Sequence, residues 1–288
     1  MAIELSTPDV GQLGEVVSAL RGWQHEGSPM QLHPGDLGWN WQFGAEATAA
    51  ALRTWSRDGQ LLAIGFLDGP DVLRMTVAPQ VWREEELAHQ VVADLSEPQR
   101  GILPAGKASV ETPDGTRVKD LLSDVGWSDG EPWTPLRHDL TGPLEQTGLR
   151  IEVIGSGQEF EFTAVHRSAW GSPRFTDELW RVMAAGLPFA DARCLLAYDD
   201  QGVAVAGVTV WSAGPGKPGL IEPLGVHGAH RGRGYATAIC VAAAANLKEL
   251  GASSALVCTP SLLTSAVATY KSAGFQQLPE RLDRSRDA

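Results

Sequence analysis

Two arginines and two glycines alternate in HRGRGYATA at 230–238, between an apolar run and an alanine-rich segment. This pattern predicts a strand, a glycine turn and then a helix. The first N–H groups of a helix lack partners within it, and the helix dipole adds about half a positive charge there. Gly232 and Gly234 permit positive φ and remove side chains that would block an anion, while Arg231 and Arg233 add guanidinium donors. We therefore expect a pyrophosphate site here.

Two other phosphate-binding motifs do not fit this stretch. A P-loop requires GxxxxGK followed by Ser or Thr, and a dinucleotide-binding fold requires GxGxxG after the first strand of a βαβ unit. Neither spacing is present at 226–238. The preceding strand instead closes a predicted antiparallel meander.

The pattern Arg231-x-x-Gly234-x-Ala236, five residues after Val226, resembles the pyrophosphate motif of the GNAT superfamily of acyl-CoA N-acyltransferases. The segment TYKSAGF at 269–275 resembles the last conserved helix of that family, in which Tyr is followed by three residues and then Gly-Phe. The resemblance covers 151–288 well and the first 140 residues in outline. It implies acetyl-CoA, or another acyl-CoA, as co-substrate. The contacts it implies for this co-substrate are Leu224, Gly225, Val226, His227, Arg231, Gly232, Arg233, Gly234, Tyr235, Ala236 and Thr237.

The chain also repeats itself. Three pairs of matching residues lie 148 or 149 positions apart, namely Ile3 and Ile151, Val77 and Val226, and Gly126 and Gly274. Such a period predicts duplication. The predicted fold is α/β (α+β), with two tandem GNAT-like units that each contain a mixed, mostly antiparallel twisted sheet flanked by helices. We place the units at 1–145 and 146–288, an arrangement similar to that of mycothiol synthase-like enzymes, which keep one competent unit.

Hydrophobic periodicity and turn residues predict the elements of the C-terminal unit. Thr176 is the expected N-cap of a helix. Gly251 and Gly274 are expected to end two further helices. The expected helices are 159–170, 176–185, 234–250 and 262–273, and the expected strands are 194–199, 203–211, 219–226 and 254–258.

The N-terminal unit lacks the features that make the anion site. Aligned on Val77, it places Glu84, Glu85 and Glu86 where the C-terminal unit has its glycine turn. Each carboxylate would repel a phosphate by about 4 kcal/mol at roughly 4 Å in an effective dielectric near 20. Leu122 takes the place of Tyr270. We expect this unit to be structural or to wall the acceptor pocket, with a regulatory role as the alternative.

Acyl transfer to an amine requires removal of a proton from the amine and stabilisation of the leaving thiolate. Glu222 is the candidate base, expected at the start of a strand among apolar residues that raise its pKa. Its alternative role is an edge carboxylate facing water. Tyr270 is the candidate acid implied by the resemblance, and its alternative role is packing between helix and sheet. Leu263 stands where many relatives have an Asn that contacts the cofactor, which removes one contact.

Histidines and tryptophans near this region leave alternatives open. His227 and His230 have no third ligand nearby, so phosphate contact or solvent exposure is favoured and no metal is predicted. His166 and Trp170, four residues apart on a helix, either line the acceptor site or pack in the core.

Two further tryptophans, Trp39 and Trp41, lie close together in the segment 35–44. They either stack on a substrate or seal the interface between the units. Sealing is the favoured alternative.

The composition argues against several classes of binding partner and location. The 288 residues carry a formal charge of −12, without a basic block, so nucleic acid and anionic membranes are poor partners. The longest apolar stretch, near 236–247, is too short to span a bilayer core of about 30 Å, and the N-terminus lacks a signal pattern. A cytoplasmic location is expected, and the three cysteines suit reduced, buried thiols.

The leading hypothesis is an N-acetyltransferase that moves an acetyl or other acyl group from acetyl-CoA to a primary amine of a small molecule. Transfer would occur by direct attack in a ternary complex (EC 2.3.1 type). The alternatives are acylation of a peptide or protein amine, or a non-catalytic acyl-CoA-binding module. A monomer is expected because two units already form a pseudo-dimer, with a homodimer as the alternative. The acceptor and the acyl chain length stay open.

Overall fold

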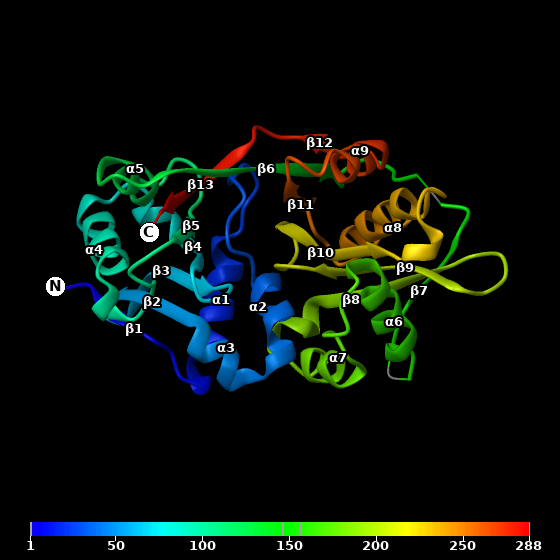
Figure 1. Ribbon diagram of the computed structural model, residues 1–288, viewed down its shortest axis with the longest axis horizontal. Coiled ribbons are helices and arrows are strands. Elements are labelled where there is room, and N and C mark those ends of the chain that lie inside the picture. The colour runs from blue at the N-terminus through cyan, green and yellow to red at the C-terminus, as the bar shows by residue number, and fades with distance from the viewer. Residues whose placement is uncertain (1, 146, 156, 288) are drawn as a thin grey trace.

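In the part of the chain that the structure describes, both halves contain a similar series of strands and helices, with three α-helices after the first strand in the first half and two in the second (Figure 1). The computed structural model describes residues 2–145, 147–155 and 157–287. The first half contains β1 (Glu4–Ser6), α1 (Leu13–Trp23), α2 (Pro34–Asn40), α3 (Ala45–Ala51), β2 (Leu52–Arg57), β3 (Gln60–Leu67), β4 (Val72–Val77), α4 (Glu85–Ser96), β5 (Ala108–Glu111), α5 (Arg117–Asp124) and β6 (Ser128–Asp139). The second half contains β7 (Arg150–Val153), α6 (Glu159–Trp170), α7 (Asp177–Ala184), β8 (Ala192–Tyr198), β9 (Ala204–Trp211), β10 (Pro218–Val226), α8 (Tyr235–Glu249), β11 (Ser254–Pro260), α9 (Thr264–Ser272), β12 (Gln276–Gln277) and β13 (Arg281–Arg286).

The local signals in the C-terminal half predicted α6 to α9 and β8 to β11 to within two residues, whereas β7, β12 and β13 were not predicted. The Thr176 hydroxyl accepts a hydrogen bond from the Leu179 N–H and so caps α7. Gly251 and Gly274 follow α8 and α9 with φ of +83° and +89°. Because these signals are local, the surrounding tertiary structure did not alter them.

Within the described residues the strands form one thirteen-stranded sheet, in the order β1-β2-β3-β4-β5-β13-β6-β11-β10-β9-β8-β7, with β12 beside β6. The β4–β5 and β10–β11 pairs are parallel, and the other pairs are antiparallel. This mixed, mostly antiparallel sheet flanked by helices is the fold class that the repeat predicted.

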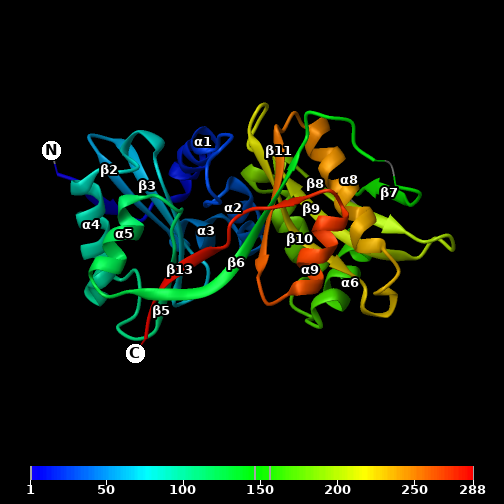
Figure 2. The same cartoon turned by 90° about the horizontal axis from the view of Figure 1, so that it is seen from above.

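The two halves exchange strands at the centre of the sheet. The long strand β6 pairs with β13 through residues 128–133 and with β11 through 133–139. The last strand, β13, returns to the first half and pairs with β5 there. Figure 2 shows β6 running from one half to the other with β13 beside it. The predicted boundary at 145/146 stays a prediction, because residue 146 lies outside the described residues, and the strands on its two sides belong to one sheet.

Tryptophans and glycines bring helix α2 of the first half against the second half. A β-carbon on Gly35 or Gly38 would lie within 2.6 Å of the Trp211 ring, so only glycine permits this contact. Trp41 is buried, and its ring lies where a β-carbon on Gly186 would be. Trp41 therefore seals the interface, as favoured from the sequence.

Candidate acyl-transfer site

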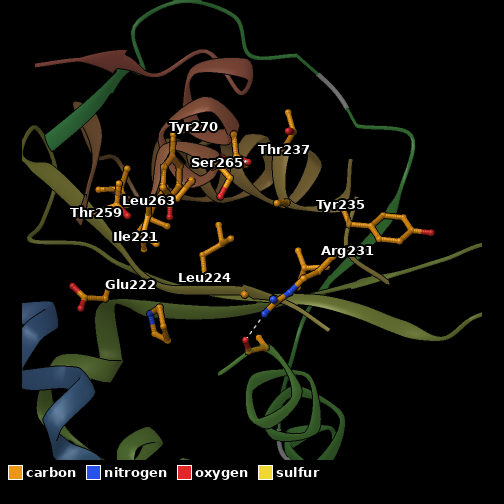
Figure 3. A pocket seen from close by; sticks show the side chains of 18 of the residues that line it. Ile221, Glu222, Leu224, Arg231, Tyr235, Thr237, Thr259, Leu263, Ser265 and Tyr270 are labelled. Atoms are coloured by element: carbon orange, nitrogen blue, oxygen red, sulfur yellow. Dashed lines mark hydrogen bonds between the residues drawn. The ribbon is translucent and has the colours of Figure 1, made fainter. Parts of the chain in front are cut away.

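The main cavity lies where two parallel strands separate. Strands β10 and β11 pair only through Pro218–Leu220 and Ser254–Leu256. Beyond that point a pocket of about 870 Å³ is lined by residues 221–226 on one side and 257–259 on the other. A register shift in β10 between Ile221 and Leu224 accompanies the separation. Helix α9 covers the pocket, and the start of α8 closes one end (Figure 3).

The glycine turn has the backbone geometry that an anion site requires. Gly232 and Gly234 have φ of +76° and +81°, and Gly234 is the N-cap of α8. A β-carbon at either position would meet no atom within 4 Å, so the backbone conformation explains the glycines better than crowding does. The first turn of α8, Tyr235 to Thr237, lines the pocket with its unpaired N–H groups at this end.

The turn is fixed to the end of helix α6. The Arg231 guanidinium donates a hydrogen bond to the carbonyl oxygen of Ala169, as the dashed line in Figure 3 marks. The Gly228 N–H donates to the Ser168 hydroxyl at 3.0 Å. Arg231 therefore positions the turn as well as adding charge beside it.

Most of the predicted co-substrate contacts line this pocket, and two do not. Arg233 and His227 lie outside the lining, and the His227 ring instead accepts from the Ala229 N–H. His230, Leu263, Ser265 and Thr269 line it. Leu263 thus presents an apolar side chain where relatives have Asn, while the Ser265 hydroxyl lies nearby (Figure 3).

Glu222 lies at the centre of β10, so the expectation that it begins the strand was wrong. Its carbonyl oxygen accepts a hydrogen bond from the Trp211 indole at 2.6 Å. Its side chain is 40% exposed and lines both the main pocket and a second cavity. Although solvent reaches part of the side chain, the surrounding protein desolvates the carboxylate and raises the pKa of Glu222 to about 7, while Arg74 opposes the rise and Asp36 adds to it.

The first half of the chain contributes charges to this site that the sequence reasoning missed. Arg74 on β4 lies 3.9 Å from the Glu222 carboxylate and 2.7 Å from Asp36 on α2. It also lies within 3.3 Å of Asp68 and Glu111. Burial alone would lower the pKa of Arg74, but the surrounding carboxylates, Asp36 first among them, raise it well above its usual value. An arginine in the apolar run VLRMTV was a signal, because a buried cation requires partners.

Tyr270 projects from α9 into the main pocket, with its ring directed toward β10 (Figure 3). The residue is buried. Burial raises the pKa of its phenol above the usual range, and Cys240 and Glu222 add to the rise. The hydroxyl is therefore protonated at any physiological pH.

A second cavity of about 300 Å³ adjoins the first at the boundary between the two halves. Four residues line both cavities, namely Trp39, His166, Trp170 and Glu222. His166 and Trp170 thus line the site, which was one of the two alternatives left open. Gly225 is needed at this point because a β-carbon there would lie 2.4 Å from the Trp170 ring.

The matching region of the first half is occupied by the protein's own arginines. Arg57 binds Glu84 and Glu86 at 2.5 and 3.0 Å, and Arg117 binds Glu85 at 2.8 Å. The three carboxylates at the start of α4 are thus paired within the protein. Leu122, at the position of Tyr270, is completely buried.

Two negative findings apply to the part of the chain that the structure describes. No group of three or more His, Cys, Asp and Glu side chains is arranged to hold a metal ion there. None of the helices there has the length and apolar character needed to cross a bilayer.

The pocket between diverging strands, with the glycine turn at a helix start beside it, suits an extended ligand that carries a pyrophosphate. Comparisons with known proteins bear on which ligand this is. Residues 160–275 match the family "Acetyltransferase (GNAT) family". Within the C-terminal half, residues 160–275 are therefore similar to the GNAT acetyltransferases, a family whose members use an acyl-CoA as co-substrate. No curated protein matches the sequence.

Solved structures extend the likeness to the whole fold. A GNAT-family acetyltransferase from Colwellia psychrerythraea is 14% identical, with a TM-score of 0.63 and 100% of both chains covered. A GCN5-related N-acetyltransferase from Sphaerobacter thermophilus is 18% identical, with a TM-score of 0.58 and 99% of this chain and 95% of the other covered. A tandem GNAT protein from the clavulanic acid biosynthesis pathway is 14% identical, with a TM-score of 0.59 and 99% and 98% covered.

Proposed function

We propose that the protein is an acyl-CoA-dependent N-acyltransferase, most simply an acetyltransferase, that acts on a primary amine of a small molecule. One observation carries the proposal. A single pocket extends from the glycine turn at the start of α8 to Glu222 and Tyr270, the candidate proton acceptor and donor. The match of residues 160–275 to the GNAT family supports the same activity.

The residues of the main pocket fit an acyl-CoA. The turn 231–234 and the first N–H groups of α8 suit its pyrophosphate. Along residues 221–226 the side of β10 that faces the pocket is not paired with β11, so its backbone groups are available to the pantetheine amides and to the thioester oxygen. When bound, the thioester would supply the acyl group, and the candidate donors to its oxygen are the N–H groups of Leu224 and Val226, since that of Gly225 faces β9.

Glu222 is the proposed general base. With a pKa raised to about 7, a substantial fraction of its carboxyl is ionised at neutral pH. It takes a proton from the amine, whose nitrogen forms the new C–N bond while the C–S bond breaks. The position of Glu222 on the walls of both cavities supports this role, because donor and acceptor must meet there.

Tyr270 is the proposed partner of the leaving sulfur. A thiol with a pKa of about 8.5 is a stronger acid than the buried phenol, so complete proton transfer from Tyr270 is uphill. Tyr270 therefore acts chiefly by donating a hydrogen bond to the thiolate. Water supplies the proton that completes the thiol.

The second cavity is the proposed acceptor site. Its volume of about 300 Å³ lies at the low end of the range typical of small-ligand pockets. Both halves of the chain wall it, which gives the N-terminal half a role in acceptor binding. A small molecule is therefore favoured over a peptide or protein amine.

The test combines coenzyme A binding with an acceptor screen. Calorimetry should give one coenzyme A per chain, because the carboxylates of the first half are already paired with arginine. Acetyl-CoA and a panel of small amines and peptides should then release thiol with at least one small amine. Absence of coenzyme A binding contradicts the proposal. Binding without turnover across the panel supports a non-catalytic module, and turnover with peptides alone supports the peptide alternative.

A further inference from the structure

The second cavity contains an unusual concentration of aromatic side chains from both halves of the chain. We refer to Trp39, Phe43, His166 and Trp170 as the aromatic box. The His166 and Trp170 rings stack at 4.2 Å between centroids with an interplanar angle of 17°, and the Trp39 and His166 rings lie 5.3 Å apart. Phe175 packs beneath the box, 4.8 Å from Trp39 and 4.7 Å from His166.

Two members of the box are left open to solvent. Phe43 is 60% exposed and Trp170 is 48% exposed, and both line the second cavity. A single exposed apolar side chain needs no explanation, but several aromatic rings that line one concave site are typical of ligand pockets. Three of the rings are also held by their neighbours, since Trp170 lies against Gly225, Trp39 against Phe175, and His166 against both Trp170 and Phe175. A rigid aromatic wall binds flat apolar groups at little cost in side-chain entropy.

The electrostatics of the cavity suit an amine. Burial lowers the pKa of His166 to about 4, and Arg167 adds to the decrease, so the ring is uncharged at neutral pH and does not repel a cation. Asp36 and Asp68 line the cavity together with Glu222, while Arg74 and Arg174 supply the opposite charge. The faces of Trp39 and Trp170 add the attraction of aromatic rings for an ammonium group.

From this arrangement we propose that the acceptor is a primary amine with an aromatic body, such as an arylalkylamine. Its ring lies in the aromatic box and its nitrogen lies at Glu222, where the two cavities meet. This inference rests on the proposed function and specifies the substrate class of the same site. Hydrophilic aliphatic amines are expected to bind less well, because they would bury less apolar surface against the exposed Phe43 and Trp170 side chains.

The test measures amine affinity directly. Phenethylamine, cyclohexylethylamine and glucosamine are titrated by calorimetry into the protein, with and without saturating coenzyme A. Phenethylamine should bind at least about tenfold more tightly than glucosamine, and more tightly than cyclohexylethylamine because of its ring. Equal affinities, or a preference for glucosamine, would overturn the inference.

Variants at Phe43 locate the binding site. Phe43→Ser should weaken phenethylamine binding about tenfold and leave glucosamine binding unchanged, whereas Phe43→Trp should restore it. Val125→Ser, a change at another exposed apolar residue outside both cavities, is the matched control and should have no effect. If Phe43→Ser leaves the phenethylamine Kd unchanged, the box is not the acceptor site.

Failure of the wild-type protein to bind coenzyme A would contradict the proposed function and not the amine preference. The titrations without coenzyme A measure the amine preference separately, so the two outcomes can be told apart.

Discussion

Arg74 on β4 and Glu222 on β10 lie 3.9 Å apart, although they belong to opposite halves of the chain. The half without the glycine turn therefore supplies a cation next to the candidate base. Arg74 is itself held by Asp36, Asp68 and Glu111. Glu111 continues the network to Arg281 on β13 at 2.6 Å. The strand exchange and the candidate site are thus connected through one group of paired charges, with Arg74, Glu111 and Arg281 largely buried.

Replacement of Arg74 should change the pH dependence of acyl transfer. Arg74 lowers the pKa of Glu222 against the effect of burial, so its loss raises that pKa above about 7. The base form then appears only at higher pH. For Arg74→Gln we expect the acidic limb of the kcat/KM profile to move up by about one pH unit or more. Arg74→Lys keeps the charge and should retain most of the wild-type profile. An unchanged limb in Arg74→Gln would show that Arg74 does not act on the base.

Glu222→Gln should remove the proton acceptor and keep the shape of the pocket. We expect kcat to fall by a factor of about 100 or more, with the Kd for coenzyme A within twofold of wild type. Steady-state kinetics and calorimetry provide the two readouts. Glu86→Gln, a change at an exposed carboxylate on α4, is the control and should leave both constants unaltered. Near-normal turnover by Glu222→Gln contradicts its role as base.

Tyr270→Phe removes a single hydroxyl from the wall of the main pocket. The hydrogen bond to the leaving thiolate is lost, so kcat should fall by about 10-fold to 100-fold while coenzyme A still binds. The pH profile should keep its acidic limb, because that limb belongs to Glu222. A loss of folding stability with unchanged kcat would assign Tyr270 a packing role alone.

Gly234→Ala tests the turn at the start of α8. An L-residue in the left-handed region costs about 1–2 kcal/mol, and relaxation of the turn would move the N–H groups away from the pyrophosphate. We expect roughly a tenfold or greater loss of coenzyme A affinity, and complete loss in Gly234→Glu. Gly216→Ala is the matched control for Gly234→Ala. Gly216 also has a positive φ and open space around it, but it lies in the β9–β10 connection. It should lower stability similarly without changing the coenzyme A Kd.

Arg281→Met tests the buried network at the exchanged strand. Arg281 is 8% exposed and pairs with Glu111 and Asp283, so its removal leaves two buried carboxylates without their closest cation. Loss of one partner of a buried pair typically costs about 3–5 kcal/mol, measured here as the free energy of urea unfolding. Arg83→Met breaks the exposed pair with Asp120 and should cost less than about 1 kcal/mol. Equal costs would contradict the structural importance of the network.

The sequence by itself determined the features that consecutive residues make. The glycine turn at 231–234 was recognisable because an anion site at a helix start is built from the backbone of neighbouring residues. The sequence also predicted the helix ends at Gly251 and Gly274, because each signal lies within a short window. The repeat that relates Val77 to Val226 could be recognised because its spacing is constant.

Only the tertiary structure decided how the two halves combine. The pairing of β13 with β5, and of β6 with β11, left no local signal, because strand edges offer the same hydrogen bonds to any partner. Arg74 and Glu222 are 148 positions apart in the sequence, so their contact depends on how the halves pack together. The aromatic box likewise combines His166 and Trp170 of α6 with Trp39 of α2 and Phe43 just after α2. Such a site exists only once both halves have folded against each other, since neither half contains all of its walls.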